Sequence, residues 1–263
     1  MPLPSGKAAR FLELHGSAFV IANAWDAGSA KILAGFGFAA LATSSGACAG
    51  TLGRRDGQVS RDEALAHARS IVEATDLPVS ADLEHCFADD AAGVAETVGL
   101  AADIGLAGCS IEDSYQSKLY PFEQAVERVA AARNRRLVLT ARAENFLRGN
   151  PDLDDTIARL QAYEAAGADV LYAPGLRSAD EIRAVCSALS KPFNFMAGIK
   201  GKSFSVRELQ AAGVRRISLA TSLYRAAMTG LVEAAREVKE KGTFGYLERS
   251  LATQELSKLM QDG

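Results

Sequence analysis

Acidic side chains recur at the carboxyl ends of apolar, β-rich runs in this sequence. One run ends in SADLE (residues 80–84) and the next in SIEDS (residues 110–114). Because side chains alternate along a strand, Asp82 and Glu84 share one face of the first run, and Glu112 takes the equivalent face of the second. Carboxylates gathered in one place cannot all stay ionised without a compensating cation. Oxygen ligands without His or Cys favour a hard ion, Mg²⁺ or else Mn²⁺.

Arg142 and Asp56 are expected to join these acids. The period of two along TARAE (residues 140–144) brings Arg142 to the same face, and its planar guanidinium suits a substrate carboxylate held by two hydrogen bonds. Asp56 lies in a Gly-rich segment, residues 46–60, which is expected to be a long loop. The pair Ser45-Gly46 before it has two interpretations: a plain turn, or a turn whose backbone N–H groups hold an anionic oxygen.

Eight short β-rich runs alternate with alanine-rich helical stretches, and these elements must position the site. Helical spacing of apolar residues is clear over residues 122–133 and 152–166. The pattern predicts a parallel sheet, and eight strands in 263 residues predict an α/β protein with a single (β/α)8 TIM barrel over residues 1–263. A doubly wound open sheet is the alternative, but no GxGxxG follows the first strand. The expected strands are residues 18–26, 39–45, 78–84, 108–114, 137–144, 168–175, 192–198 and 215–221.

In such a barrel the polar strand ends converge at one mouth, the face where these folds bind substrates. Residues 240–263 are charged and helical in pattern, and we expect them to form a C-terminal helical extension. The apolar Phe193 and Phe195 are expected to pack between the barrel and its helices. His15 and His67 lie in helical runs and are expected on the surface.

The composition excludes several classes of protein. The net charge of −3, from 29 basic and 32 acidic residues, offers no basic surface for nucleic acid. Charged residues near the N-terminus argue against an export signal, and the uncharged run over residues 34–53 is a strand and loop rather than a membrane span. The protein is therefore expected in the cytoplasm, with no membrane partner. Its cysteines, without CxxC spacing, are expected to be reduced thiols: Cys48, Cys86, Cys109 and Cys186.

Five motifs resemble the isocitrate lyase/phosphoenolpyruvate mutase superfamily: NAWDA (23–27), TSSGA (43–47), SADLE (80–84), SIEDS (110–114) and TARAEN (140–145). They stand in the family's order, and the resemblance covers about residues 15–240. It implies a Mg²⁺-dependent barrel enzyme acting on 2-oxo acids or their enol forms. It also implies a homotetramer that exchanges a C-terminal helix.

The resemblance also implies roles for the matching residues. Asp82 matches the direct metal ligand, and the acids that hold the metal largely through its waters match Glu84, Glu112 and Asp56. The substrate's carboxylate and oxo oxygens would be bound by Ser45, Gly46 and Ala47, together with Arg142. Among these residues, the catalytic group is expected to comprise Arg142, Asp56 and Glu112. The implied chemistry is stabilisation of an enolate as a bond to C3 breaks.

Departures from the family pattern limit the choice of reaction. Isocitrate and methylisocitrate lyases carry a Lys-Lys-Cys-Gly-His loop after the fourth strand, whereas residues 113–121 (DSYQSKLYP) hold neither Cys nor His. The catalytic thiol of those lyases is therefore missing. After Glu84, where members of the family often have Asn-Gly-Tyr, this chain has His85, Cys86 and Phe87. Adjacent side chains rarely face each other, so we do not expect His85 and Cys86 to form a nucleophile and base, although they could alter substrate choice.

The leading hypothesis is a lyase that cleaves a C–C bond in a small 2-oxo carboxylate, for example by decarboxylating an oxaloacetate-like diacid. Phosphoenolpyruvate mutase or phosphonopyruvate hydrolase chemistry on a P–C bond is the alternative. A non-catalytic barrel that binds a metabolite is a further one. A Schiff-base aldolase would need a Lys in a strand, and Lys118 and Lys200 are both expected in loops.

Overall fold

Eight parallel strands close into a barrel in the computed structural model, which describes residues 6–201 and 204–260. The order around the barrel is β1-β10-β9-β8-β7-β4-β3-β2, and every neighbouring pair is parallel. This confirms the (β/α)8 barrel and excludes the open sheet. The barrel strands are β1 (Phe19–Asn23), β2 (Leu41–Ala42), β3 (Val79–Asp82), β4 (Gly108–Glu112), β7 (Val138–Arg142), β8 (Val170–Tyr172), β9 (Phe193–Met196) and β10 (Arg216–Ser218).

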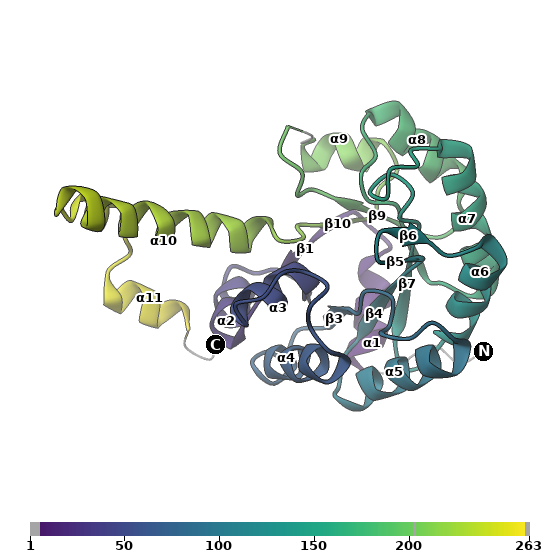
Figure 1. The fold of residues 1–263 in the computed structure, drawn as a ribbon, viewed down its shortest axis with the longest axis horizontal. Coiled ribbons are helices and arrows are strands. Elements are labelled where there is room, and N and C mark those ends of the chain that lie inside the picture. Colours follow the sequence, from purple (N-terminus) through teal and green to yellow (C-terminus); the bar gives the residue numbers. More distant parts are fainter. Residues whose placement is uncertain (1–5, 202–203, 261–263) are drawn as a thin grey trace.

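Helices follow the strands and surround the barrel (Figure 1). Several begin at a side-chain cap. In α4, for example, Ser60 and Glu63 form a reciprocal capping box that satisfies otherwise unpaired N–H groups. The helices are α1 (Lys7–Leu14), α2 (Ala27–Gly35), α3 (Ser45–Thr51), α4 (Arg61–Glu73), α5 (Ala91–Asp103), α6 (Phe122–Ala131), α7 (Leu153–Ala166), α8 (Ala179–Ala188), α9 (Val206–Ala211), α10 (Ser222–Lys241) and α11 (Thr253–Leu259).

The side chains of β9 alternate between the helices and the barrel interior. Phe193 and Phe195 are 1% and 3% exposed and belong to the main hydrophobic cluster, as expected, whereas Asn194 bonds to Ser218 inside the barrel. A second cluster closes the N-terminal end of the barrel, where Phe11 of α1 packs against the first residues of several strands. The open end is therefore the C-terminal one.

Both helical histidines depart from the expected surface positions. His15 is 4% exposed, and its ring lies edge-on to Phe11 and Phe19. Burial and the charge of Arg216 lower the pKa of His15 to about 3. His67 is half-buried, with Nε2 at 2.8 Å from the carbonyl oxygen of Trp25. The prediction for His15 was wrong because local spacing does not show that α1 packs beneath the barrel.

Two expected loops contain regular structure. The segment 46–60 was expected to be a loop, but α3 occupies its first six residues, because packing of Ala47, Cys48 and Ala49 in the interior outweighs the low helix propensity of its glycines. After β4, residues 114–119 form a hairpin of β5 (Ser114–Tyr115) and β6 (Lys118–Leu119). Lys118 therefore lies in a short strand rather than in a loop, but it is outside the barrel.

The C-terminal elements leave the barrel and return to it. The twenty-residue α10 projects away from the strands and buries none of its residues (Figure 1). A 3₁₀ helix, η1 (Gly245–Arg249), and α11 follow, and α11 packs against α2. The extension expected from residue 240 thus begins in the last turn of α10. No helix in residues 6–201 and 204–260 is long and apolar enough to cross a membrane.

Candidate functional site

A cavity of about 260 Å³ opens at the C-terminal ends of the strands, and we call it the mouth cavity. Residues from most barrel strands line it, which is the arrangement expected of a (β/α)8 active site. Glu84 lies instead in an adjoining hollow that it shares with Ser45, Asp56 and Glu112. Gly46 and Ala47 line neither the mouth cavity nor the adjoining hollow. Five predicted site residues line the mouth cavity: Ser45, Asp56, Asp82, Glu112 and Arg142.

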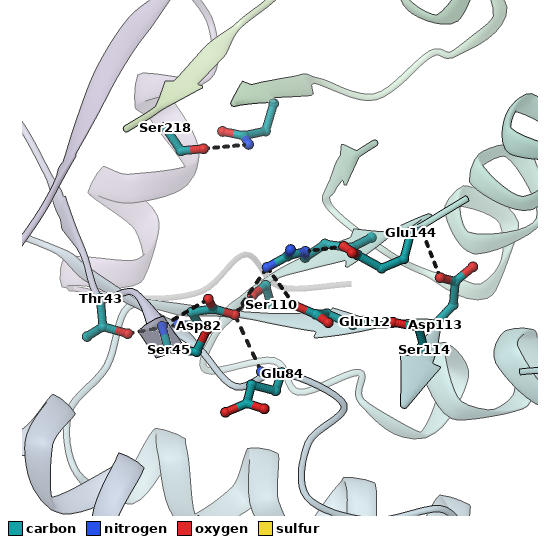
Figure 2. Close-up of polar contacts among 12 residues, drawn as sticks. Thr43, Ser45, Asp82, Glu84, Ser110, Glu112, Asp113, Ser114, Glu144 and Ser218 are labelled. Atoms are coloured by element: carbon teal, nitrogen blue, oxygen red, sulfur yellow. Dashed lines mark hydrogen bonds and ion pairs between the residues drawn. The ribbon is translucent and has the colours of Figure 1, made fainter. Parts of the chain in front are cut away.

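Arg142 lies among three carboxylates at the centre of the site. Its Nη1 is 3.2 Å from Asp82 Oδ1 and 2.9 Å from Glu112 Oε1, while its Nε is 2.9 Å from Glu144 Oε1 (Figure 2). The last residues of β3, β4 and β7 bring these groups together, since Asp82, Glu112 and Arg142 end neighbouring strands. The predicted convergence of acids and arginine is therefore present, with the arginine held by the acids.

Asp82 also accepts hydrogen bonds from neighbouring elements. The backbone N–H of Ser45 donates to Oδ2 at 3.2 Å, and Ser110 Oγ donates to Oδ1 at 3.3 Å (Figure 2). Thr43 Oγ1 accepts from the N–H of Asp82 at 2.9 Å. These bonds fix the carboxylate at the start of α3, where first-turn N–H groups have no acceptor inside the helix.

Asp56 comes to the site through a close approach to Gly46. A Cβ at Gly46 would lie 3.0 Å from Thr221 Cγ2 and 3.4 Å from Asp56 Oδ2. A side chain at position 46 would therefore press mainly on Thr221, which would have to shift by a few tenths of an ångström. Asp56, in the segment between α3 and α4, thus lies against the first turn of α3 and lines the barrel mouth.

The acids at the mouth carry more negative charge than the nearby arginines neutralise. Burial and the charges of Asp82 and Asp56 raise the pKa of Glu84 to about 7. Burial and neighbouring carboxylates also hold the pKa of Glu112 and of Glu144 above their ordinary values, against the opposing effect of Arg142 and Arg148. One oxygen of Glu144, Oε2, is buried without a hydrogen bond. A further cation at the site would therefore be favoured by the excess negative charge.

The donor set fits a Mg²⁺ ion that keeps most of its water. Among residues 6–201 and 204–260, no three carboxylate, imidazole or thiol side chains converge closely enough to ligate one ion together. Mg²⁺ is commonly held by one or two carboxylates and retains several waters. Asp82, Glu112 and Asp56 line the mouth cavity, and Glu84 lines the hollow beside it, so these four acids are the residues that would hold such an ion.

His85 and Cys86 do not form a nucleophile and its base. Cys86 is fully buried in the hydrophobic core, which raises the pKa of its thiol well above the ordinary value. The His85 ring stacks on Tyr115 of the hairpin, with 4.1 Å between ring centroids. Burial and the charge of Arg128 lower the pKa of His85 to about 4, so the imidazole is neutral at pH 7. His85 lines the adjoining hollow together with Glu84 and Glu112.

The mouth cavity is also lined by residues that were not predicted as site residues, among them Arg148, Tyr172, Asn194 and Arg216. Arg148 Nη2 lies 3.2 Å from Glu112 Oε2, and the Arg142 guanidinium lies 4.7 Å above the Tyr172 ring. The outward direction of Phe193 and Phe195 was a signal that Asn194 points inward. Arg148 follows Glu144 by four residues, but the irregular segment after β7 gives no spacing from which to place it.

The fold and site define a (β/α)8 barrel with acids and arginines gathered in the cavity at its mouth. Residues 10–239 match the family model described as phosphoenolpyruvate phosphomutase, and the chain belongs to this family of lyases and mutases. A structure of a putative lyase/mutase from Burkholderia cenocepacia is similar, with 45% identity, a TM-score of 0.93, and coverage of 96% of this chain and 94% of that one.

Two curated relatives of similar identity carry different names, one without and one with a stated activity. An uncharacterized protein of Mycobacterium tuberculosis is 31% identical over 96% of both chains. An oxaloacetate decarboxylase of Bradyrhizobium diazoefficiens is 30% identical over 74% of this chain and 70% of that one. The resemblance to the isocitrate lyase/phosphoenolpyruvate mutase superfamily is thereby confirmed, while the relatives differ in the activity that their names state.

Proposed function

We propose that this chain is a Mg²⁺-dependent carbon–carbon lyase, also able to use Mn²⁺, that acts on a small 2-oxo carboxylate. Decarboxylation of an oxaloacetate-like diacid is the leading reaction. The convergence of Asp82, Glu112 and Arg142 within 2.9–3.2 Å at the barrel mouth carries the proposal. This set can hold a cation and an anionic substrate side by side.

The chain's own residues bind and orient the substrate. The guanidinium of Arg142 and the first-turn amides of Ser45, Gly46 and Ala47 hold the carboxylate next to the oxo group. Asp82 binds the ion, with Glu84, Glu112 and Asp56 around it. When bound, the divalent ion supplies positive charge that stabilises the negative charge on the 2-oxo oxygen as the bond to C3 breaks.

The hairpin after β4 supports decarboxylation over cleavage that needs an acid on the leaving group. The segment 113–121 has neither thiol nor imidazole, and its tip, Gln116-Ser117, has positive φ angles that close a tight turn. Carbon dioxide leaves without accepting a proton, and the pyruvate enolate that remains can take its C3 proton from water, so this reaction requires no side-chain acid there. The decarboxylase name of the Bradyrhizobium relative supports the same reaction, and the phosphomutase description of the family supports P–C chemistry as the alternative.

A product-release assay tests the proposal. The purified protein with Mg²⁺ is given oxaloacetate, malate-like diacids, methylisocitrate and phosphonopyruvate, and pyruvate, CO₂ and phosphate are measured. We expect CO₂ and pyruvate from oxaloacetate, lost in Asp82→Asn and kept in Asp180→Asn, whose side chain is 89% exposed on α8. Phosphate from phosphonopyruvate without CO₂ from oxaloacetate would establish the alternative. Tight binding of Mg²⁺ and oxalate without any turnover would instead indicate a metabolite-binding barrel.

The assembly and its location are part of the proposal. The exposed apolar side chains Leu231, Val232 and Val238 on the projecting α10 support a homotetramer in which this helix is covered by another subunit. Four free cysteines, three of them buried, support a reducing compartment, the cytoplasm.

A further inference from the structure

A second arginine, Arg216, lies inside the barrel away from the acid cluster. It is the first residue of β10, is 5% exposed, and lines the mouth cavity that Arg142 also lines. Its direction follows from strand alternation, since Ile217 belongs to the hydrophobic cluster beneath the helices. Arg216 therefore faces the interior on the side of the barrel formed by β9 and β10.

The Arg216 guanidinium has polar partners but no anionic one in the part of the chain that the structure describes. Nε donates to Asn194 Oδ1 at 2.8 Å, and Nη2 donates to Thr140 Oγ1 at 3.0 Å. Nη1 is buried and makes no hydrogen bond to any described residue. The buried Arg142 and Arg159, in contrast, are each paired with carboxylates.

An isolated buried cation is unfavourable unless an anion or a hydrogen-bond network compensates it. Burial, together with the positive charge of Arg142, lowers the pKa of Arg216 to about 10, so the side chain stays cationic at neutral pH. Asn194 also donates to Ser218 Oγ at 3.0 Å, which fixes the amide oxygen toward Arg216. Figure 2 shows Ser218 across the barrel from Asp82 and Glu112. Arg216 reaches Thr140 on β7, and its guanidinium lies 5.9 Å from the centre of the Phe11 ring at the closed end of the barrel, so the mouth cavity has a cationic floor beneath the acid cluster.

We propose that Arg216, oriented by Asn194 and Thr140, is a second anion-binding subsite that receives a carboxylate at the far end of the substrate. The inference rests on the proposed function, because it takes the 2-oxo carboxylate end to be held at Arg142. Thr140 precedes Arg142 by two residues on β7, a spacing of about 6.6 Å along a strand. The ligand class is therefore a four- or five-carbon 2-oxo diacid, and oxalate is too short to reach both arginines.

Binding of three unreactive probes isolates the distal carboxylate. Isothermal titration of the Mg²⁺-loaded protein compares oxalate, 2-oxoglutarate and 2-oxopentanoate, of which the last two differ only in the terminal carboxylate. We expect the wild-type protein to bind 2-oxoglutarate about tenfold more tightly than 2-oxopentanoate, as one charge-assisted contact supplies. In Arg216→Met this ratio falls to about one, and the Kd of oxalate changes less than about twofold.

Two control variants keep the test decisive. Arg215→Met removes a cation from the neighbouring exposed position and should keep the wild-type ratio. Arg216→Lys keeps the charge but loses the planar fork, and it replaces the Met variant if that protein does not fold. The expected ratio for the Lys variant lies between those of wild type and Met.

Three results would overturn the inference: no wild-type preference for the distal carboxylate, an unchanged ratio in both Arg216 variants, or an equal loss of oxalate and 2-oxoglutarate affinity. Failure of the wild-type protein to bind oxalate would overturn the proposed function instead, together with everything that rests on it.

Discussion

Arg142 holds three carboxylates on one guanidinium, and this concentration of charge makes single residues at the mouth unusually sensitive. Removing one partner from a buried ion-pair network leaves charges without compensation, which is more damaging than never having had the network. The same acids support the proposed divalent ion, since an ion near Asp82 and Glu112 would supply charge that Arg142 now supplies.

Arg142→Met is expected to destabilise the metal-free protein by about 3–5 kcal/mol, because Asp82, Glu112 and Glu144 lose their shared cation. Added Mg²⁺ should recover part of this stability. Thermal unfolding with and without Mg²⁺ measures both effects, and Arg207→Met, at an exposed position on α9, is the control. An Arg142 variant that melts at the wild-type temperature in chelator would contradict the argument.

Glu84 makes the stability of the metal-free protein depend on pH. Its pKa is about 7 in the folded state against an ordinary value of 4.5, so between these values the folded protein binds a proton that the unfolded chain releases. Stability should therefore fall as pH rises from about 4.5 to about 7. With screening at this half-buried position, Glu84→Gln should be about 1–2 kcal/mol more stable than wild type at pH 8.

Denaturant unfolding in chelator at pH 5 and pH 8 tests this dependence. The gain from Glu84→Gln should be small at pH 5 and appear at pH 8. Glu233→Gln, at an exposed position on α10, should show no such change. An equal effect of Glu84→Gln at both values would show that the carboxylate is not responsible.

At the level of elements, the strands were predictable and the segments between them less so. Alternation and spacing placed all eight barrel strands, and the polar ends of β3, β4 and β7 gave Asp82, Glu112 and Arg142. Helix α3 was missed because its stability comes from packing rather than propensity. Arg216 was missed, although the alternation of Ile217 with Arg216 and Ser218 is a local signal that Arg216 faces the barrel interior.

Gly99 and Gly46 both lie in helices, but only Gly46 lies against residues of the site, so their alanine variants should behave differently. Gly99 in α5 has open space where a Cβ would lie, so Gly99→Ala should stabilise the protein by about 0.5–1 kcal/mol. Gly46→Ala should give no such gain, because its Cβ would press on Thr221 and Asp56. We expect Gly46→Ala to raise KM at least severalfold, as measured in the product-release assay. Equal behaviour of the two variants would mean that the contact at Gly46 has no role in the site.

At the scale of the whole molecule, α10 exposes apolar side chains that another subunit would bury. A helix that projects from a barrel with Leu231 61% exposed and no buried residue gains little from its own chain. If a second subunit covers it, Leu231→Glu should convert the proposed tetramer to smaller species in light scattering. Val206→Glu, at an exposed apolar position on α9, should leave the assembly unchanged. A wild-type protein that is monomeric at micromolar concentration would rule out this arrangement.

The pairing of Arg142 with the mouth acids also bears on how the protein matures. Because the carboxylates already share a cation from their own chain, the barrel can fold before any ion arrives. Newly made chains would then accumulate whatever the supply of magnesium. If the proposed ion is required for activity, its scarcity would reduce the active fraction of the protein and leave the amount of folded protein unaltered.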